Sequence, residues 1–371
     1  MSVSYVPVMG AKRGELTALS KLQSHMADRV LPLFELPAKK PEAKLIEPAI
    51  NRTAKCAGGY WKNRSVLLDI SKWSPSSRTE SGIHVLEYAL TQLRSHSVVA
   101  HPVIGYDRWG DPQYIQALSN IRLSHNITPC IRLDREAIED MLDPDYFSEQ
   151  IDTILSSLDL TPGNCFVMID LGDVSTTAVI DIISYVDTAN DTLKALGFEV
   201  IIVAGGSMPA GINEAVNSPD TEGCIPRVEM MAWKASFTGI ADKGLIFGDY
   251  VIRNPSSTEG VIAPHANAKI RYTIRDQHFI VRGHSKKLDS LTAQHKLLAQ
   301  KLIHSSHFMG APYSWGDTEI FNCSLGIKEV RDHTGMIAID SNHHMQVVIA
   351  EVFEQHTNIS VKSLIMPVET A

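Results

Sequence analysis

Acidic side chains follow most of the short apolar runs in the first two thirds of the chain. These seven carboxylates are Glu15, Glu35, Asp69, Asp107, Asp134, Asp170 and Asp249. Gathering unpaired carboxylates in one cavity is costly, so they must bind a cation, share protons or pair with basic residues such as Lys12, Arg13 and Arg132. A hard divalent ion such as Mg²⁺ or Mn²⁺ suits an oxygen-rich set. A metal centre and a salt-bridge network are both open, and the predicted metal ligands are Asp69, Asp170, Asp249 and Asp317.

A glycine-rich turn is the second candidate. Gly205, Gly206 and Ser207 follow the apolar run Val200–Val203. Glycines let backbone N–H groups approach an anion at a helix start, so this turn is a predicted phosphate site, with Arg271 as a further phosphate ligand. A plain strand-to-helix turn, and pairing of Arg271 with acidic residues, are the alternatives.

Two adjacent histidines, His343 and His344, form the third candidate set. With Asn342 as the N-cap of a helix, one ring is expected to act as a general base or to join Asp317 on a metal. Purely structural histidines are the alternative. Lys12 is a further catalytic candidate; its place after the first strand also suits a Schiff-base lysine of a pyridoxal-phosphate barrel, although pairing with Glu35 or Asp69 is favoured.

Eight apolar runs, separated by helical patterns, must position these residues. They are Tyr5–Met9, Val30–Phe34, Val66–Leu68, Val99–Gly105, Ile127–Ile131, Phe166–Ile169, Val200–Val203 and Leu245–Phe247. Unbroken Val/Ile/Leu runs fit parallel strands that are covered on both faces. The pattern predicts an α/β fold, a (β/α)8 TIM-like barrel, in which the carboxyl ends of all strands meet at one mouth.

The remaining chain exceeds the ~250 residues of a plain barrel by about 100 residues. We expect a barrel over residues 1–254 and, over 263–371, an α+β cap packed on the barrel mouth. Within the cap, the expected elements are a hairpin of Lys269–Ile274 with His278–Arg282, a helix over Leu288–His304, a strand over Met336–Ile339 and a helix over His344–Gln355.

Composition excludes several classes of protein. With 44% hydrophobic and 20% charged residues, the 371-residue chain is typical of a globular protein. A net charge of −8 argues against a broadly basic nucleic-acid coat, although a local basic groove is compatible with it. The five scattered cysteines indicate reduced thiols, and no apolar run approaches the ~18–20 residues that span a bilayer. We expect a cytoplasmic protein without membrane contact.

Motifs along nearly the whole chain resemble the phage- and prophage-associated "beta protein" family. They include Tyr5-Val6-Pro7-Val8, Lys12-x-Gly14-Glu15, Pro32-Leu33-Phe34-Glu35, Gly248-Asp249-Tyr250, Arg271-Tyr272-Thr273, Arg282-Gly283, Phe308-x-Gly310-x-x-Tyr313-Ser314-x-Gly316-Asp317 and Asn342-His343-His344. The stretch Met336–Ser341 departs from the family's usual Trp-Gly approach. The resemblance implies a mobile-element or phage-conflict setting and no defined reaction.

Two functions are therefore predicted. The first is a metal-dependent phosphodiesterase or nuclease-like hydrolase acting on a phosphorylated, nucleotide or nucleic-acid substrate; its catalytic residues would be Lys12, Glu35, Asp69, Asp170, His343 and His344. The second is a non-catalytic binding or sensing module of a phage-defence or phage-encoded system, which recognises a ligand or a partner protein from the same operon. Converging carboxylates with open coordination would favour the hydrolase, whereas carboxylates fully paired with Arg and Lys would favour the binding module.

Overall fold

Eight parallel strands close into a barrel in the computed structural model, which describes residues 3–38, 45–125, 127–239, 244–256 and 266–365. The strands are β1 (Tyr5–Met9), β2 (Leu33–Glu35), β3 (Ser65–Asp69), β4 (Val99–Gly105), β5 (Cys130–Leu133), β6 (Phe166–Asp173), β7 (Ile201–Gly206) and β9 (Leu245–Asp249). Their order is β1-β2-β3-β4-β5-β6-β7-β9, and β9 pairs with both β7 and β1. The predicted TIM-like barrel is confirmed, since each predicted apolar run supplies or adjoins one strand.

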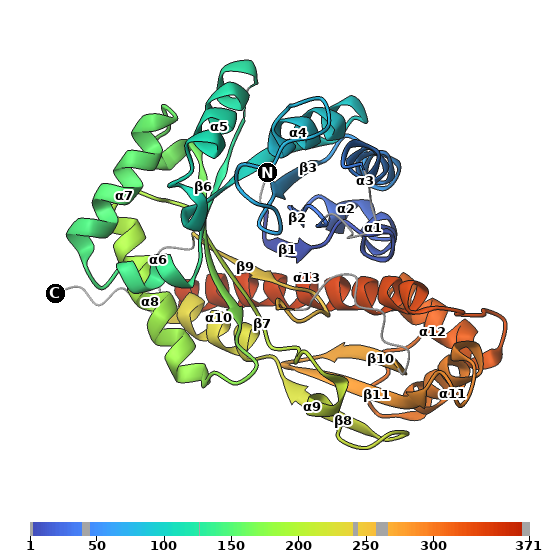
Figure 1. Cartoon of the computed structure of the whole chain (residues 1–371). Helices are drawn as coiled ribbons and strands as arrows, with labels where there is room; N and C mark the ends of the chain where they lie inside the picture. Colours follow the sequence, from blue (N-terminus) through green and yellow to red (C-terminus); the bar gives the residue numbers. More distant parts are fainter. Residues whose placement is uncertain (1–2, 39–44, 126, 240–243, 257–265, 366–371) are drawn as a thin grey trace.

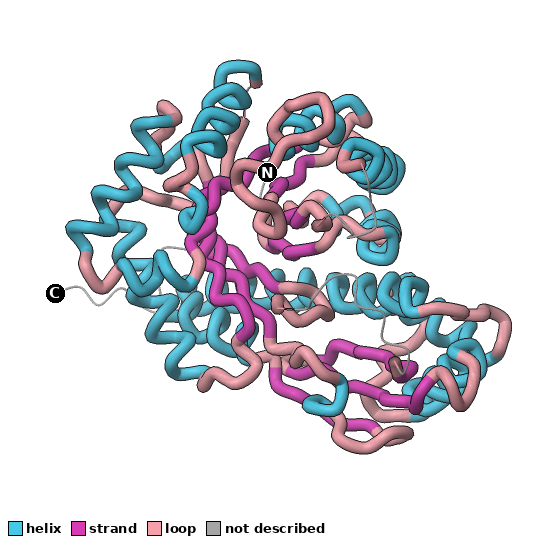
Figure 2. The backbone as a smooth tube through the Cα atoms, viewed as in Figure 1, coloured by secondary structure: helices cyan, strands magenta, loops and turns pink. Residues whose placement is uncertain are grey.

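Helices surround the barrel strands (Figures 1 and 2). They are α1 (Arg13–Ser20), α2 (Ser24–Ala27), α3 (Glu47–Tyr60), α4 (Val85–Ser95), α5 (Pro112–Ser124), α6 (Arg135–Asp140), α7 (Pro144–Ser157), α8 (Val179–Ala195), α10 (Val228–Gly239) and α13 (His333–Ile365), with 3-10 turns η1 (Tyr106–Arg108) and η2 (Pro162–Asn164). Local sequence sets several helix starts. Asp111 caps α5 by accepting from Gln113 N, and Pro112 occupies the first turn, where a missing N–H is harmless. No helix in the described ranges is both long and apolar enough to cross a membrane.

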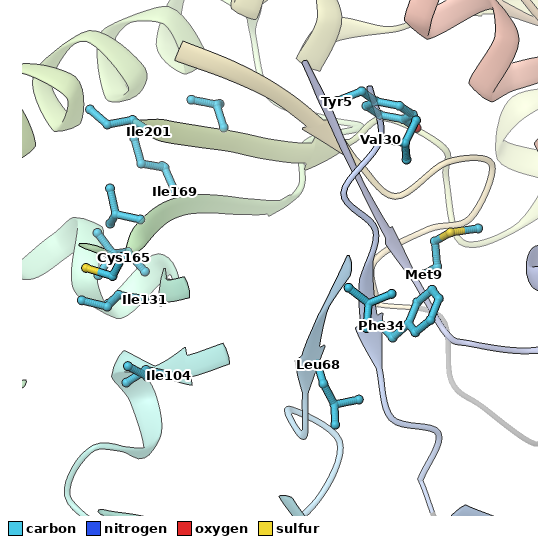
Figure 3. Close-up of a cluster of buried hydrophobic side chains, with 14 of the residues drawn as sticks. Tyr5, Met9, Val30, Phe34, Leu68, Ile104, Ile131, Cys165, Ile169 and Ile201 are labelled. Carbon is cyan, nitrogen blue, oxygen red and sulfur yellow. The ribbon is translucent and has the colours of Figure 1, made fainter. Parts of the chain in front are cut away.

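Alternate residues of each barrel strand face the helices or the lumen. Figure 3 shows side chains of the outward set, including Tyr5, Phe34 and Leu68, which belong to the large core between strands and helices. A smaller core fills the lumen: Val6, Val8, Leu31, Leu33, Leu67, Val103, Cys130, Met168, Ile202, Ala204 and Tyr250. This alternation decides which polar residues at the strand ends point inward.

A second unit with its own core carries the remaining strands (Figure 2, lower right). Its antiparallel sheet has the order β10 (Asn267–Ile274), β11 (Gln277–Ser285) and β8 (Glu222–Pro226), and its helices are α9 (Ile212–Ala215), α11 (Leu291–His304) and α12 (Trp315–Leu325). The predicted hairpin and the predicted helix over Leu288–His304 are confirmed. Strand β8, however, comes from the connection between β7 and α10, inside the segment expected to belong to the barrel alone.

Helix α13 differs most from expectation. The predicted strand Met336–Ile339 is wrong, because these residues lie within α13, and His343 and His344 lie in its middle rather than at a helix start. Met345, Val348 and Val352 of α13 pack in the barrel core, and the helix lies along α1. Figure 1 shows α13 (red) between the barrel and the sheet of β10 and β11. It therefore completes the helical ring as the eighth barrel helix.

The division of the chain differs accordingly from the expected barrel over 1–254 and cap over 263–371. Most of the α+β unit, β10, β11, α11 and α12, is inserted between the eighth barrel strand, β9, and the eighth barrel helix, α13, while α9 and β8 come from the connection between β7 and α10. Residues 257–265 and 366–371, at the edges of the expected cap, lie outside the described residues. Met336 and Ile339 lie three positions apart and pack in the same core, a spacing that suits a helix, which explains why the short-strand interpretation failed.

Candidate functional site

Arg132, near the end of β5, is the centre of a buried ionic network at the barrel mouth. Its Nε and Nη2 donate to Asp170 Oδ2 at 2.8 and 2.6 Å, and Nη1 donates to Asp69 Oδ2. Nη2 also lies 3.1 Å from Glu35 Oε1 and 2.8 Å from the hydroxyl of Tyr250. One guanidinium thus contacts three of the predicted mouth carboxylates.

Three further basic side chains contact the same carboxylates. Arg108 Nη2 donates to Asp69 Oδ1 at 2.9 Å, and Arg253 Nη2 donates to Glu35 Oε2 at 2.6 Å. Lys72 Nζ lies 3.2 Å from Glu35 Oε2, and Arg253 Nε lies 3.9 Å from Glu15 Oε1. Arg108 Nε also lies 3.5 Å from Asp107 Oδ1, so four basic side chains contact five acidic ones: Glu15, Glu35, Asp69, Asp107 and Asp170.

The strand register explains this convergence. Glu35 and Asp69 are directly paired neighbours on β2 and β3, and each stands two residues after an inward leucine, Leu33 or Leu67. Like charges in this position repel, so they require the arginines between them. Gly105 makes room for one of these arginines, because a Cβ at that position would lie 2.0 Å from Arg108 Nη2.

The surroundings shift the pKa values of Glu35, Arg132 and Tyr250 away from neutrality. Burial alone would raise the pKa of Glu35, but Arg253, Arg132 and Lys72 outweigh burial and lower it to about 2. Burial acts to lower the pKa of Arg132, yet Asp170 and the other carboxylates raise it well above its ordinary value. Burial and the neighbouring Asp170 also raise the pKa of Tyr250. None of these three groups titrates near neutrality, so they suit fixed electrostatic recognition better than proton transfer.

The four predicted metal ligands do not converge on one site in the structure. Asp69 and Asp170 bind Arg132, whereas Asp249 points outward, accepting from Tyr5 Oη at 2.6 Å. Asp317 lies in the second unit, where it accepts from Tyr272 Oη at 2.6 Å. Within the described ranges, no three His, Cys, Asp or Glu residues are arranged to hold a metal ion.

His343 and His344 are fully buried and join α13 to the strands around it. His344 Nε2 donates to Asp249 Oδ2 at 2.8 Å, while its Nδ1 lies 2.7 Å from Thr273 Oγ1. Burial lowers the pKa of His344, so a neutral ring that accepts from the threonine hydroxyl fits. The hydroxyl of Thr273, the imidazole of His344 and the carboxylate of Asp249 follow one another by hydrogen bonds, as in a nucleophilic triad. Thr273 is also fully buried, however, so a substrate has no access to it.

His343 forms a second carboxylate pair. Its Nδ1 lies 2.8 Å from Asp317 Oδ2 and its Nε2 lies 2.7 Å from the carbonyl oxygen of Thr273. The ring is thus held between a side-chain carboxylate and a backbone carbonyl group. The ring of Tyr272 stacks on it with centroids 3.7 Å apart. The burial and pairing of both histidines fit the structural role that was the alternative to catalysis.

The predicted phosphate site also differs from expectation. Gly205, Gly206 and Ser207 are buried, and a Cβ on Gly206 would lie 3.0 Å from Pro255. The neighbouring carboxyl group belongs to Glu229, whose pKa burial raises to about 7. The turn thus packs beside an acidic group and is not open to an anion.

Arg271 and Lys12, which were also predicted to contact phosphate or substrate, do not join this turn. Arg271 Nε donates to Asp340 Oδ2 at 3.1 Å and its Nη1 donates to the carbonyl oxygen of Ile252 at 3.0 Å. Lys12 is exposed just before α1, where its backbone N–H donates to Glu15 Oε2 at 3.2 Å. Of the six predicted catalytic residues, the structure brings together Glu35, Asp69 and Asp170.

Four members of the network, Lys72, Arg108, Tyr250 and Arg253, were not predicted. A signal existed for Tyr250, because it follows Ile246 and Gly248 at the inward spacing of two residues on β9. The other three belong to loops or to a 3-10 turn, where periodicity gives no direction.

Comparison with solved structures gives only distant similarities, and a search of curated proteins found no match. A type I 3-dehydroquinate dehydratase from Clostridium difficile is 10% identical with a TM-score of 0.35, covering 67% of this chain and 76% of its own. The carboxyl transferase domain of Rhizobium etli pyruvate carboxylase is 13% identical with a TM-score of 0.30, covering 69% and 41%. The arginine decarboxylase of Paramecium bursaria Chlorella virus is 10% identical with a TM-score of 0.27, covering 74% and 64%. Similarities this low support no argument about function.

A family model gives a more specific result. The model described as "Beta protein" matches residues 5–350, which extend from the first residue of β1 into α13 and include the inserted α+β unit. The matched range contains every residue of the Arg132 network. The chain therefore belongs to the beta protein family.

Proposed function

We propose that the barrel mouth is a binding site that recognises an anionic ligand without turning it over. The observation that carries this proposal is the environment of Glu35, which contacts three basic side chains, Lys72, Arg132 and Arg253. Two of them still reach solvent, since the side chains of Lys72 and Arg253 are 19% and 17% exposed. Glu35 thus gathers three basic side chains at the mouth, and two of them remain partly exposed to a ligand although Arg132 is shared with Asp69 and Asp170.

The floor of the mouth supports recognition rather than chemistry. Asp69 and Asp170 use their oxygens to accept from Arg108, Arg132 and Tyr250. Oxygens engaged in this way are not open to a divalent ion unless the arginines move away. Full pairing with arginine was the arrangement expected of a binding module, so the metal-dependent hydrolase has less support.

An ion-paired floor can give specificity for a ligand, because an entering anion meets donors whose orientation is already fixed. Buried ion pairs of this kind hold arginines in fixed positions, and a guanidinium offers a planar set of donors to carboxylate or phosphate oxygens. Arg253 is suited to this role, since its side chain pairs with Glu35 and lies near Glu15 while 17% of it remains exposed to a phosphate- or carboxylate-bearing ligand.

The biological setting is part of the proposal. Membership of the beta protein family supports a phage-encoded or phage-conflict role, in which the anion belongs to a nucleotide or to an acidic partner protein from the same operon. All five cysteines are unpaired, which supports a cytoplasmic setting.

Isothermal titration with pyrophosphate tests the proposal. We expect Arg253→Gln and Lys72→Gln each to weaken the mouth's affinity at least tenfold at low salt, because each removes a charged donor. Arg64→Gln is the matched control: it removes a partly exposed arginine just before β3, at the opposite end of the barrel, and should leave affinity unchanged. Equal affinity in wild type and Arg253→Gln would refute the mouth as the anion site.

A turnover assay separates the binding module from the hydrolase. Phosphate release from ATP is measured with Mg²⁺ or Mn²⁺ present, and we expect no release above the buffer blank. Steady release that disappears in Asp170→Asn would contradict the proposal and restore the hydrolase.

A further inference from the structure

Three basic side chains share one face of the β10–β11 hairpin, outside the mouth network. Lys269 pairs directly with Arg282 in the strand register, and Arg271 lies two residues further along β10. Ala268, Ile270 and Tyr272 alternate with these residues and pack in the core of the second unit. The basic residues therefore point to the opposite face of the sheet.

This arrangement is unfavourable without an added anion. Directly opposed residues of antiparallel strands have Cβ atoms about 5 Å apart, and like charges at that spacing destabilise the pair. Asp340 is the carboxylate that neutralises Arg271, at 3.1 Å. Lys269 forms no ion pair or hydrogen bond with the residues that the structure describes, and the charges that act on it are those of Arg271, Asp340 and Arg282.

Arg282 has an unused donor beside this lysine. The residue is buried, and its Nη1 donates to the carbonyl oxygens of Val216 and Asn217 at 2.6 and 2.7 Å. Its Nε is buried without an acceptor in the described part of the chain. Fixing the guanidinium through two carbonyl groups orients it without neutralising its charge, which leaves the charge available to a ligand.

The electrostatic environment agrees with this geometry. Burial, and then the neighbouring Arg271, lower the pKa of Lys269 to about 8. Burial first, and the nearby His295 and Lys269 next, lower the pKa of His333 to about 4. Burial is the larger cause of both shifts, and the neighbouring positive charges add to it.

We infer that Lys269 and Arg282 form a second anion-binding site, built for the phosphate-type oxyanion of a ligand, with Arg271 held beside them by Asp340. The lysine supplies a mobile point charge and the arginine a fixed donor. This site is distinct from the mouth: it lies on the inserted unit, whereas Arg253 and Lys72 belong to the barrel. It goes beyond the proposed function and does not depend on it.

Pyrophosphate binding and melting temperature test the inference. Wild type should gain melting temperature when pyrophosphate is added, because ligands that bind the folded state stabilise it. Lys269→Met relieves repulsion, so it should melt at the same or a higher temperature than wild type, and its affinity at this site should fall at least tenfold. Arg275→Gln is the matched control, since Arg275 adjoins the same hairpin with a side chain that is 67% exposed.

Two further variants separate this site from the mouth and from a structural role. Arg253→Gln should leave pyrophosphate binding at the hairpin intact, so the two sites fail independently. Affinity at the hairpin in wild type should fall as the pH rises from 7 to 9, and Lys269→Arg should remove this loss. Equal pyrophosphate stabilisation of wild type and Lys269→Met, or a Lys269→Met protein less stable than wild type, would overturn the inference.

Discussion

Replacing Arg132 by methionine removes the centre of the mouth network while keeping a side chain of similar length. Asp69 retains Arg108, and Glu35 retains Arg253 and Lys72. Asp170 loses its arginine and keeps the hydroxyl of Tyr250 and the backbone N–H of Gly172. The variant therefore leaves one buried carboxylate without a cation.

The expected cost follows from that orphaned charge. Removing one partner of a buried ion pair destabilises a protein by about 3–5 kcal/mol. Asp170 is only 7% exposed, so little water can replace the guanidinium. Arg135→Met is the control: Arg135 and Glu139 form an exposed pair, with side chains 92% and 66% exposed, and losing such a pair costs at most ~0.5 kcal/mol.

Urea unfolding at several pH values measures the effect. In Arg132→Met, burial without a cation disfavours the charged form of Asp170. The loss of stability should therefore be larger at pH 7, where this carboxyl is ionised in the unfolded chain, than at pH 4. A deficit below ~1 kcal/mol at pH 7, or one that grows on acidification, would refute this account of the network.

Two further variants probe the packing around the site. Gly316→Ala should lower the free energy of unfolding in urea by ~1–3 kcal/mol, because the new Cβ would lie 2.5 Å from the carbonyl oxygen of Ile339 on α13. Gly110→Ala is the control and should be nearly neutral, because a Cβ there would have nothing within 4 Å. Equal effects of the two substitutions would contradict the close contact at Gly316. Glu229→Gln should flatten the pH dependence of stability. The folded-state pKa of Glu229, about 7, exceeds the ordinary value of 4.5, so wild type loses stability as the pH rises between these values. Glu222→Gln, at an exposed position, is the control and should behave like wild type. If Glu229→Gln loses as much stability over this pH range as wild type does, Glu229 is excluded as the source.

The barrel could be predicted because its strands are long apolar runs that end in polar residues. The spacing of two residues along a strand also distinguishes Asp170, which follows Met168 of the lumen, from Asp249, which follows outward Phe247. The prediction that all the carboxylates face the mouth overlooked the direction of each side chain. Asp249 lies at the expected end of its strand but points outward.

The partners of these carboxylates were not predictable in the same way. Arg253 and Lys72 come from loops, and their reach depends on backbone turns that have no periodic signal. The positions of His343 and His344 could not be predicted without knowing where α13 begins. The short apolar stretch Met336–Ile339 is compatible with both a strand and a helix.

The late position of α13 has a consequence for synthesis of the chain. Asn342 Nδ2 donates to the carbonyl oxygen of Ala18, a contact between residues 324 positions apart. While the chain emerges from the ribosome, the flank of α1 and β1 must stay uncovered until the whole inserted unit and most of α13 have been made. Closing such a distant contact is slow, and uncovered apolar surface is prone to aggregation. The nascent protein should therefore be most vulnerable during the interval in which the inserted unit is translated, and chaperones that hold partly made chains should have their largest effect there.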